Sequence, residues 1–179
     1  KMHDDLPPQR KYVVIAAPHT SNWDFILGLV GMGAIRLPLR WVGKHTLFRP
    51  PFGWFFRHVL GGIPVDRTGR HNFVDQIVEL YEKNDDMVLV MAPEGTRGHE
   101  DKWKTGFYWI AHGAGVPVVL GFIDWGRKEG GVGPLLWPTG DIEADFEHIR
   151  QFYSDKEGFH PDRKSAVALP PARKGPSSG

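Results

Sequence analysis

Residues 12–24 read YVVIAAPHTSNWD and join a short apolar run to a polar segment. Residues 12–17 are β-branched, aromatic or small apolar side chains that end at a proline, which predicts a buried strand. The Ser-x-x-Asp spacing of Ser21 and Asp24 is that of a helix capping box, so we expect a helix over residues 21–36. The polar residues in between, starting at His19, would then follow the carboxyl end of a strand directly.

The rest of the chain alternates short apolar runs with amphipathic segments. Further strands are predicted at residues 40–43, 63–65, 87–92 and 116–123, and further helices at 51–60, 72–83, 104–112 and 141–153. Strands separated by helices favour an α/β fold with a mostly parallel or mixed central sheet flanked by helices. The length of 179 residues suits one domain, predicted over residues 1–169, and the Pro-, Gly- and Ser-rich residues 170–179 predict a disordered tail.

Composition narrows the classes of function. The formal net charge is only +1, so we expect no nucleic-acid partner. The chain has no cysteine, which excludes thiolate nucleophiles and sulfur-based metal sites and agrees with a cytoplasmic location. The longest apolar stretch, residues 25–35, is shorter than the roughly 20 residues that span a bilayer. The adjacent residues 99–101 (His-Glu-Asp) are interpreted as a solvated loop, and no metal site is predicted.

Polar residues follow three of the predicted strands, at residues 19–24, 66–67 and 94–97. Active sites of open α/β sheets gather beyond the carboxyl ends of strands. His19 and Asp24 suit general base catalysis, in which the imidazole takes a proton and the carboxylate orients it. The chain offers neither a G-x-S-x-G serine nor a cysteine, so the activated hydroxyl would belong to the substrate. A purely structural role of the pair, with Asp24 as the capping acid, stays open as the alternative.

The polar residues 94–97 predict phosphate binding. Arg97 suits bidentate contacts to phosphate, and Gly95 allows the backbone to come close to a ligand. Arg67 would add a second guanidinium and Lys104 a third cation. The alternative is a surface turn in which Glu94 and an arginine form an ion pair.

Taken together and in their order along the chain, these polar motifs resemble those of the glycerolipid acyltransferases, the family that includes lysophosphatidate acyltransferase. Residues 19–24 match its H-x4-D motif, residues 62–67 (GIPVDR) resemble its second, arginine-ending motif, residues 94–97 match E-G-T-R, and residues 116–119 (VPVV) match the start of the fourth. The resemblance covers roughly residues 13–123. It departs from the family pattern at Pro18, where asparagine is frequent, and at residues 120–122, where a second proline is usual.

The resemblance implies transfer of a fatty acyl group to a hydroxyl of a lysophospholipid such as 1-acylglycerol-3-phosphate. Acyl-CoA or acyl carrier protein would be the donor, with no cofactor and no acyl-enzyme. It also implies that His19 is the general base and Asp24 its orienting partner. The residues predicted to bind the acceptor are Arg67, Glu94, Gly95, Thr96, Arg97 and Lys104. Two alternatives stay open: a thioesterase or lipid hydrolase that uses the same base on water, and a non-catalytic lipid-binding module.

A basic and aromatic stretch lies between Asp24 and Asp66, where no acidic residue occurs. Its basic residues are Arg36, Arg40, Lys44, Arg49 and Arg57, and its aromatic residues include Trp41, Phe48, Phe52, Trp54, Phe55 and Phe56. This composition is typical of a segment that lies in an anionic lipid interface. We therefore expect peripheral association with the inner face of the membrane, and packing of the aromatic residues in the core is the alternative.

Overall fold

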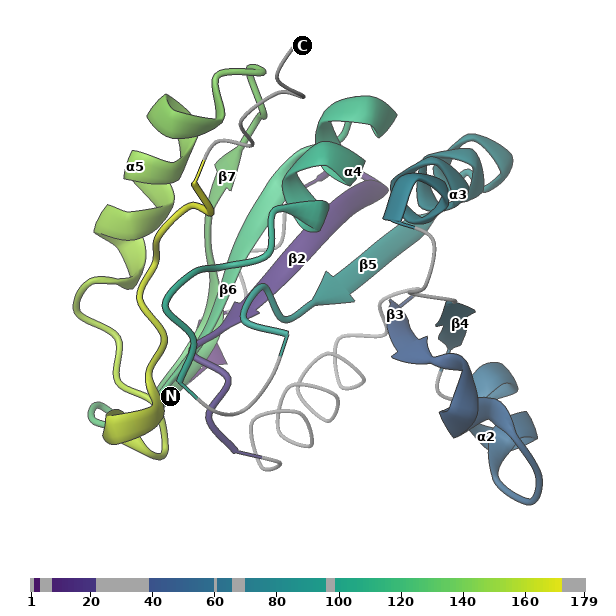
Figure 1. Ribbon diagram of the computed structural model, residues 1–179, viewed down its shortest axis with the longest axis horizontal. Helices are drawn as coiled ribbons and strands as arrows, with labels where there is room; N and C mark the ends of the chain where they lie inside the picture. The colour runs from purple at the N-terminus through teal and green to yellow at the C-terminus, as the bar shows by residue number, and fades with distance from the viewer. Residues whose placement is uncertain are drawn as a thin grey trace, which may run out of the picture.

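A seven-stranded mixed sheet forms the centre of the computed structural model (Figure 1), which describes residues 2–3, 8–21, 39–59, 61–65, 70–95 and 99–171. The strands lie in the order β1-β7-β6-β2-β5-β3-β4. Their bounds are β1 Met2–His3, β2 Lys11–Ala17, β3 Leu39–Lys44, β4 Gly62–Val65, β5 Met87–Met91, β6 Val118–Asp124 and β7 Glu129–Leu136. All neighbouring strands are parallel except β6 and β7. The expected α/β fold with a mixed sheet is thus confirmed.

Three helices cover one face of this sheet (Figure 1), namely α3 (Arg70–Lys83), α4 (Gly106–Ala114) and α5 (Ile142–Tyr153). Successive side chains of a strand point to opposite faces. Val13 and Ile15 of β2 accordingly pack in the large core cluster under these helices, while Val14 belongs to a smaller cluster on the other face. A shorter helix, α2 (Gly53–His58), and the 3₁₀ turns η1 (His45–Phe48) and η2 (Pro161–Arg163) lie outside this layer.

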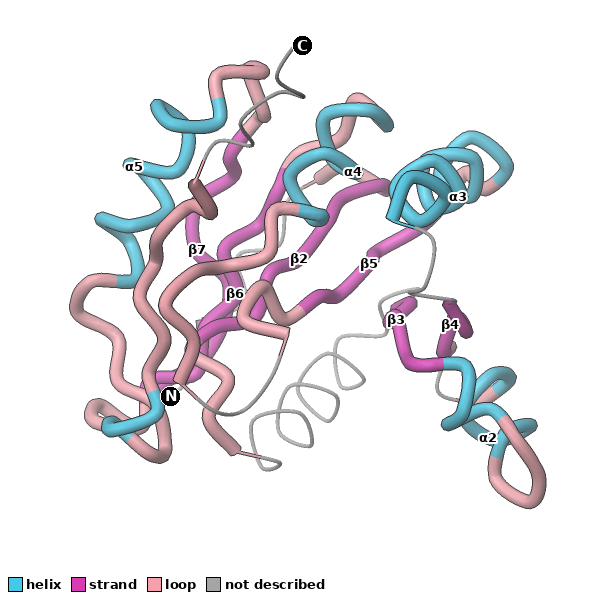
Figure 2. The backbone as a smooth tube through the Cα atoms, viewed as in Figure 1, coloured by secondary structure: helices cyan, strands magenta, loops and turns pink. Residues whose placement is uncertain are grey.

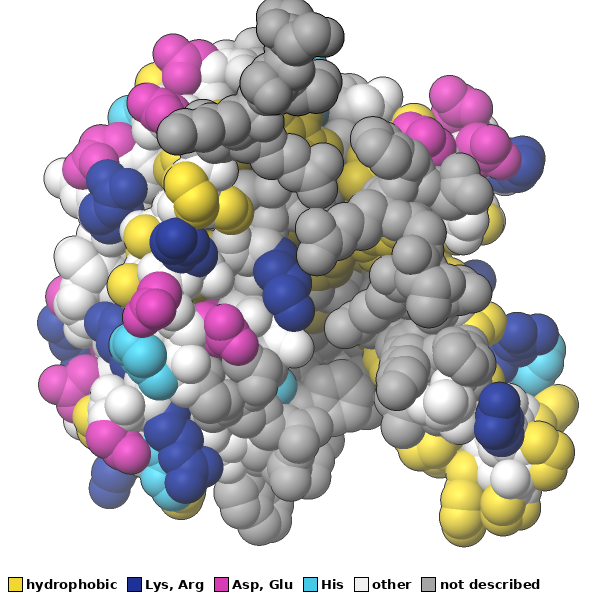
Figure 3. All heavy atoms as spheres, viewed as in Figure 1, with side chains coloured by type: hydrophobic (Ala, Val, Ile, Leu, Met, Phe, Trp, Pro, Cys, Tyr) yellow, Lys and Arg dark blue, Asp and Glu magenta, His cyan; other side chains and the backbone are white. Residues whose placement is uncertain are grey.

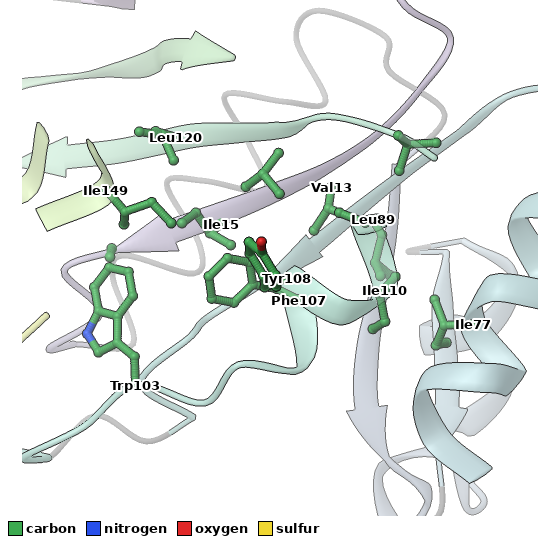
Figure 4. Packing of buried hydrophobic residues seen from close by; sticks show 14 of the residues in the cluster. Val13, Ile15, Ile77, Leu89, Trp103, Phe107, Tyr108, Ile110, Leu120 and Ile149 are labelled. Atoms are coloured by element: carbon green, nitrogen blue, oxygen red, sulfur yellow. The ribbon is translucent and has the colours of Figure 1, made fainter. Parts of the chain in front are cut away.

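The main core joins aromatic side chains to the apolar face of the sheet (Figure 4). Trp103, Phe107 and Tyr108 are fully buried against residues of β2, β5 and β6. Burial of one such side chain stabilises the fold by about 1.5–3 kcal/mol. Trp103 belongs to the loop between β5 and α4, so the packing that holds the sheet also holds a loop at its carboxyl edge.

The strands and helices predicted within the described residues are all present, with small shifts at their ends. Helix α4 begins at Gly106 rather than residue 104, and the N–H of Lys104 instead ties the preceding loop to the carbonyl of Pro93 at 2.8 Å. Strand β6 begins at Val118 rather than residue 116, because Val116 takes part in the C-terminal cap of α4. Its N–H bonds to the carbonyl of Ala111 at 3.0 Å, beyond the left-handed Gly115, as in a Schellman motif.

Strand β7 was not predicted from the sequence. Its residues, EGGVGPLL, contain three glycines and a proline, which disfavour strands when considered locally. Strand β7 forms because the turn after β6 allows it to pair antiparallel with β6. On its other side, β7 pairs with the two-residue β1, which is the edge strand of the sheet.

Two predicted segments lie outside the described residues: the helix at 21–36, apart from Ser21, and the tail beyond residue 171. Within the part of the chain that is described, no helix combines the length and the apolar character needed to cross a membrane.

Candidate active site

The candidate site lies where β2 and β5 end side by side. The two strands are parallel and pair Ile15 with Met91, so the loops that follow them leave the same edge of the sheet. His19 lies in the first loop and Glu94 in the second. The main-chain N–H of His19 donates a hydrogen bond of 2.8 Å to Oε1 of Glu94. The structure therefore brings the H-x4-D and E-G-T-R motifs into direct contact.

Glu94 is a buried carboxylate, with 1% of its surface exposed. Its second oxygen, Oε2, accepts a hydrogen bond of 3.2 Å from the hydroxyl of Ser165. A buried carboxylate needs such donors, since the loss of hydration is otherwise costly. Burial, together with the negative charge of Glu94, raises the pKa of the Tyr153 phenol well above its ordinary value. Glu94 thus sits inside the protein, beneath the loop that carries His19.

Thr20, the residue after His19, is also buried. Its Oγ1 accepts a hydrogen bond of 3.1 Å from the main-chain N–H of His160. Gly158 approaches the same side chain so closely that a Cβ there would lie 2.7 Å from Cγ2 of Thr20. The loop that carries His19 is therefore held by a segment from the far end of the described chain.

We call residues 157–168 the C-terminal clasp. Besides its contacts to Thr20 and Glu94, the clasp bonds to the loops that follow β5 and β6. The main-chain bonds are Trp125 N–H to Glu157 O at 2.9 Å, Ala166 N–H to Glu100 O at 3.2 Å and Trp103 N–H to Ala168 O at 2.9 Å. Figure 2 shows this segment as loop and a short 3₁₀ turn that pass beside the loop between β5 and α4. The clasp thus ties together the loops after β2, β5 and β6.

Gly95 and Lys104 form the exposed side of the site. Gly95 has a φ of +72°, a conformation that favours glycine. A Cβ at this position would collide with the side chain of Lys104, so the absence of a side chain lets the Lys104 ammonium lie against the backbone of the E-G-T-R loop. An exposed cation beside an accessible backbone is a suitable arrangement for a phosphate.

The structure thus places four of the predicted site residues at one edge of the sheet: His19, Glu94, Gly95 and Lys104. The other four, Asp24, Arg67, Thr96 and Arg97, lie outside the described residues. Among the residues that are described, no group of three or more His, Asp or Glu side chains is arranged to hold a metal ion.

Neither Ser165 nor the clasp was predicted from the sequence. Ser165 follows a 3₁₀ turn in a stretch without periodicity, and no motif marks it. Only the pairing of Glu94 with a distant hydroxyl identifies it, and that pairing is a property of the fold.

Comparison with known families identifies one match. Residues 1–120 match the sequence pattern of a family described as "Acyltransferase". The matched range contains β2, β5, His19 and Glu94, and it ends before the clasp begins. A comparison with curated proteins finds no match.

Proposed function

The chain belongs to the glycerolipid acyltransferase family, and on this premise we propose that it transfers a fatty acyl group from acyl-CoA or acyl carrier protein to a hydroxyl of a lysophospholipid such as 1-acylglycerol-3-phosphate. The observation that carries the proposal is the bond between His19 and Glu94, because it unites two motifs that lie 75 residues apart in the sequence. Lys104, which lies against the neighbouring Gly95, supports the proposal because it offers a cation for the phosphate of the acceptor.

The proposed reaction needs no acyl-enzyme. The His19 imidazole takes the proton of the acceptor hydroxyl while that oxygen attacks the thioester carbonyl of the donor. The new carbon–oxygen bond forms, the carbon–sulfur bond breaks, and the imidazolium returns the proton to the departing thiolate. Asp24 would orient the imidazole and stabilise its positive charge.

Acceptor binding is proposed for Lys104 with Arg67, Thr96 and Arg97, whose cations and hydroxyl suit a phosphate. Gly95 would contribute because its lack of a side chain lets Lys104 lie against the backbone. For Glu94 we propose an indirect contribution: both carboxylate oxygens accept bonds from protein groups, and a carboxylate repels a phosphate. Glu94 would then act by holding the loop that carries His19.

The central test is a product assay by mass spectrometry, with acyl-CoA and acyl carrier protein donors and a panel of lysolipids. We expect a diacyl product only when a lysolipid is supplied, and a loss of at least about a hundredfold in kcat for His19→Ala. The control is His148→Ala, since His148 is an exposed histidine on α5, and it should be as active as the wild type.

Three results would overturn the proposal. Release of free fatty acid without a lysolipid would indicate a hydrolase. Absence of turnover with every donor would indicate a non-catalytic lipid-binding module. Near-normal turnover of a folded His19→Ala variant would exclude His19 as the base.

We also propose that the protein binds the inner face of the membrane through α2. Its exposed aromatic residues support this: Phe52 and Trp54 have 65% and 69% of their surfaces exposed, and Phe55 and Val59 are exposed beside them. Figure 3 shows this apolar patch at one end of the molecule. Other aromatic residues of the stretch do pack inward, since Trp41 is buried and stacks on Phe48 with 5.6 Å between ring centroids.

The charges around α2 favour an anionic lipid surface over a protein partner. Arg49, Arg57 and His58 are exposed next to the patch, and the sequence has no acidic residue between Asp24 and Asp66. The negative surface potential of the cytoplasmic leaflet attracts arginines, while interfacial tryptophan and phenylalanine side chains insert between the headgroups.

The position of α2 suits a lipid substrate. Strand β3 runs parallel to β5, and η1 and α2 follow its carboxyl end (Figure 1). The apolar patch on α2 therefore lies at the carboxyl edge of the sheet, which is also the edge where His19 and Glu94 lie. An acceptor lipid in the membrane would face the proposed base without crossing the protein.

Vesicle co-sedimentation tests this second proposal. We expect binding to vesicles rich in phosphatidylglycerol, weaker binding to pure phosphatidylcholine, and a loss of about tenfold or more for Trp54→Ser. Trp137→Ser is the matched control, because Trp137 is also 54% exposed but belongs to neither α2 nor its flanks. Equal loss in both variants, or a dimer in solution that Trp54→Ser abolishes, would contradict the assignment.

A further inference from the structure

We infer that Ser165 is a positioning residue for His19 and acts through Glu94. The inference rests on the proposed function only in taking His19 as the base. Ser165 lies in the clasp, outside the residues 1–120 that match the family. It would be a part of the site that this chain builds from its C-terminal region.

The hydroxyl of Ser165 both donates and accepts a hydrogen bond. It donates to Oε2 of Glu94 at 3.2 Å and accepts from the main-chain N–H of Glu100 at 3.1 Å. A serine hydroxyl has one proton to donate, and the bond from Glu100 fixes the oxygen so that this proton points at the carboxylate. Ser165 is 4% exposed, so water does not readily replace it.

A chain of three groups therefore leads from the clasp to the base. Ser165 bonds to one oxygen of Glu94, and the other oxygen accepts the N–H of His19. Loss of the first bond removes one of the contacts that orient the carboxylate, and even a small rotation moves the acceptor oxygen away from the His19 N–H. Hydrogen bonds in such a buried chain depend on one another more strongly than exposed bonds do.

The clasp holds the same loop at a second point. The N–H of His160 bonds to the Thr20 hydroxyl, and Gly158 packs against the Thr20 methyl group. The loop is thus fixed at two consecutive residues, at the main chain of His19 and at the side chain of Thr20. Two such attachments limit both the position and the tilt of the imidazole that the loop carries.

We expect the contacts of the clasp to affect the catalytic rate rather than the affinity for substrates. General base catalysis needs the imidazole within hydrogen-bond reach of the acceptor hydroxyl, and misplacement by about 1 Å can cost up to a hundredfold. Substrate binding depends on other groups, among them Lys104. Weakening the clasp should therefore lower kcat and leave both KM values nearly unchanged.

The test compares Ser165→Ala with the wild type in two measurements. We expect kcat to fall about tenfold with both KM values within about twofold, and hydrogen exchange of the His19 amide to accelerate about tenfold. Ser154→Ala is the control, because Ser154 is exposed and its hydroxyl bonds to the nearby Gln151 carbonyl. An unchanged kcat, or unchanged exchange at His19, would overturn the inference.

A double-mutant cycle separates positioning from general damage to the fold. In a Glu94→Ala background, Ser165→Ala should cost no more than about a further twofold in kcat, since removal of both carboxylate oxygens has already broken the path through Glu94. Full additivity of the two changes would show that Ser165 acts independently, against the inference. If Ser165→Ala does not fold, Thr20→Val, which preserves shape and removes the acceptor for His160, should show the same pair of effects. Normal kcat and exchange in that variant would count against the clasp.

The two measurements also keep the inference distinct from the proposed function. Amide exchange at His19 needs no turnover, so faster exchange in Ser165→Ala supports the clasp even if the wild-type protein transfers no acyl group. Robust acyl transfer with normal kcat in Ser165→Ala would leave the proposed function intact and exclude the positioning role.

Discussion

The main-chain N–H of His19 donates a hydrogen bond of 2.8 Å to Oε1 of Glu94. The bond engages the backbone of the loop and leaves the orientation of the imidazole to the surrounding residues. Glu94 can therefore control where the histidine lies without competing for the ring. A buried carboxylate in this role explains why an acidic residue can stand beside a proposed phosphate site: its charge points inward, toward protein donors.

Gly95→Ala should damage acceptor binding as well as stability. Alanine at a φ of +72° costs about 1–2 kcal/mol of unfolding free energy, and its Cβ would displace Lys104. We expect the acceptor KM to rise about fivefold or more. Gly115→Ala is the control, because Gly115 has a φ of +62° and no atom of the described part of the chain lies within 4 Å of where its Cβ would be. Urea unfolding should show similar losses for both, and an equal acceptor KM in the two variants would contradict the role of the Gly95–Lys104 contact.

Lys104→Met should raise the KM for a phosphate-bearing acceptor about tenfold, because a hydrogen bond to a charged group contributes about 1.5–3 kcal/mol. The effect should vanish for a neutral monoacylglycerol acceptor. Lys102→Met provides the comparison, since Lys102 is exposed two residues earlier in the same loop. Steady-state kinetics with the two acceptors check this. A similar rise for both acceptors would show that Lys104 serves packing rather than phosphate binding.

Tyr108→Phe should destabilise the fold by about 1–3 kcal/mol at neutral pH. The buried hydroxyl donates to Oδ2 of Asp145 at 2.7 Å and accepts from the N–H of Gly140 at 3.0 Å, and both bonds are lost. Tyr12→Phe is the contrast: the Tyr12 hydroxyl is buried and has no hydrogen-bond partner among the residues that the structure describes, so its removal should be neutral or slightly stabilising. Urea titrations of both variants at pH 7 measure the difference.

The same tyrosine predicts a loss of stability at alkaline pH. Burial and the bond to Asp145 raise the pKa of Tyr108 to about 12 in the folded protein, against 10 for the exposed phenol. The folded state therefore binds this proton more tightly. The resulting stabilisation is complete below pH 10 and disappears between pH 10 and 12. Between pH 9 and 11 the unfolding free energy of the wild type should fall more than that of Tyr108→Phe, and parallel curves would contradict the assignment.

Asp141→Ala should lower the unfolding free energy by about 1 kcal/mol without changing kcat. Asp141 caps α5, and its Oδ1 accepts the N–H of Ala144 at 3.2 Å. Glu143→Ala, in the first turn of the same helix, should cost only a few tenths of a kcal/mol, because it favours the helix dipole without capping. Equal effects in the two variants would show that charge near the helix start, rather than the cap, is what stabilises α5.

The sequence predicted those parts of the fold that depend on local pattern. Strands β2, β5 and β6 are apolar runs next to prolines, and α5 is amphipathic with its capping aspartate in place. Strand β7 could not be predicted in this way, because its glycine-rich segment becomes a strand through pairing with β6 and β1. Strand pairing depends on the fold of the whole chain, and local β-propensity carries no information about the pairing partner.

The candidate site was predictable to the extent that it follows strand ends. His19 and Glu94 were singled out because each follows an apolar run, and parallel strands place such residues on one edge. The direction of Glu94 was not predictable, since nothing in its motif indicates that the carboxylate turns inward. Ser165 and His160 were missed because they reach the site from a loop without pattern, across 71 and 140 residues of sequence.

The position of the clasp in the chain sets an order of events during protein synthesis. The ribosome adds Ser165 71 residues after Glu94, which at roughly 5–20 residues per second is about 4–14 s later. Throughout that interval the nascent chain already carries both motifs, but the contacts of the clasp to Glu94 and Thr20 do not yet exist. Full competence for catalysis would therefore arrive only after the clasp has been synthesised, and a shorter nascent chain would consume lipid and acyl donor more slowly.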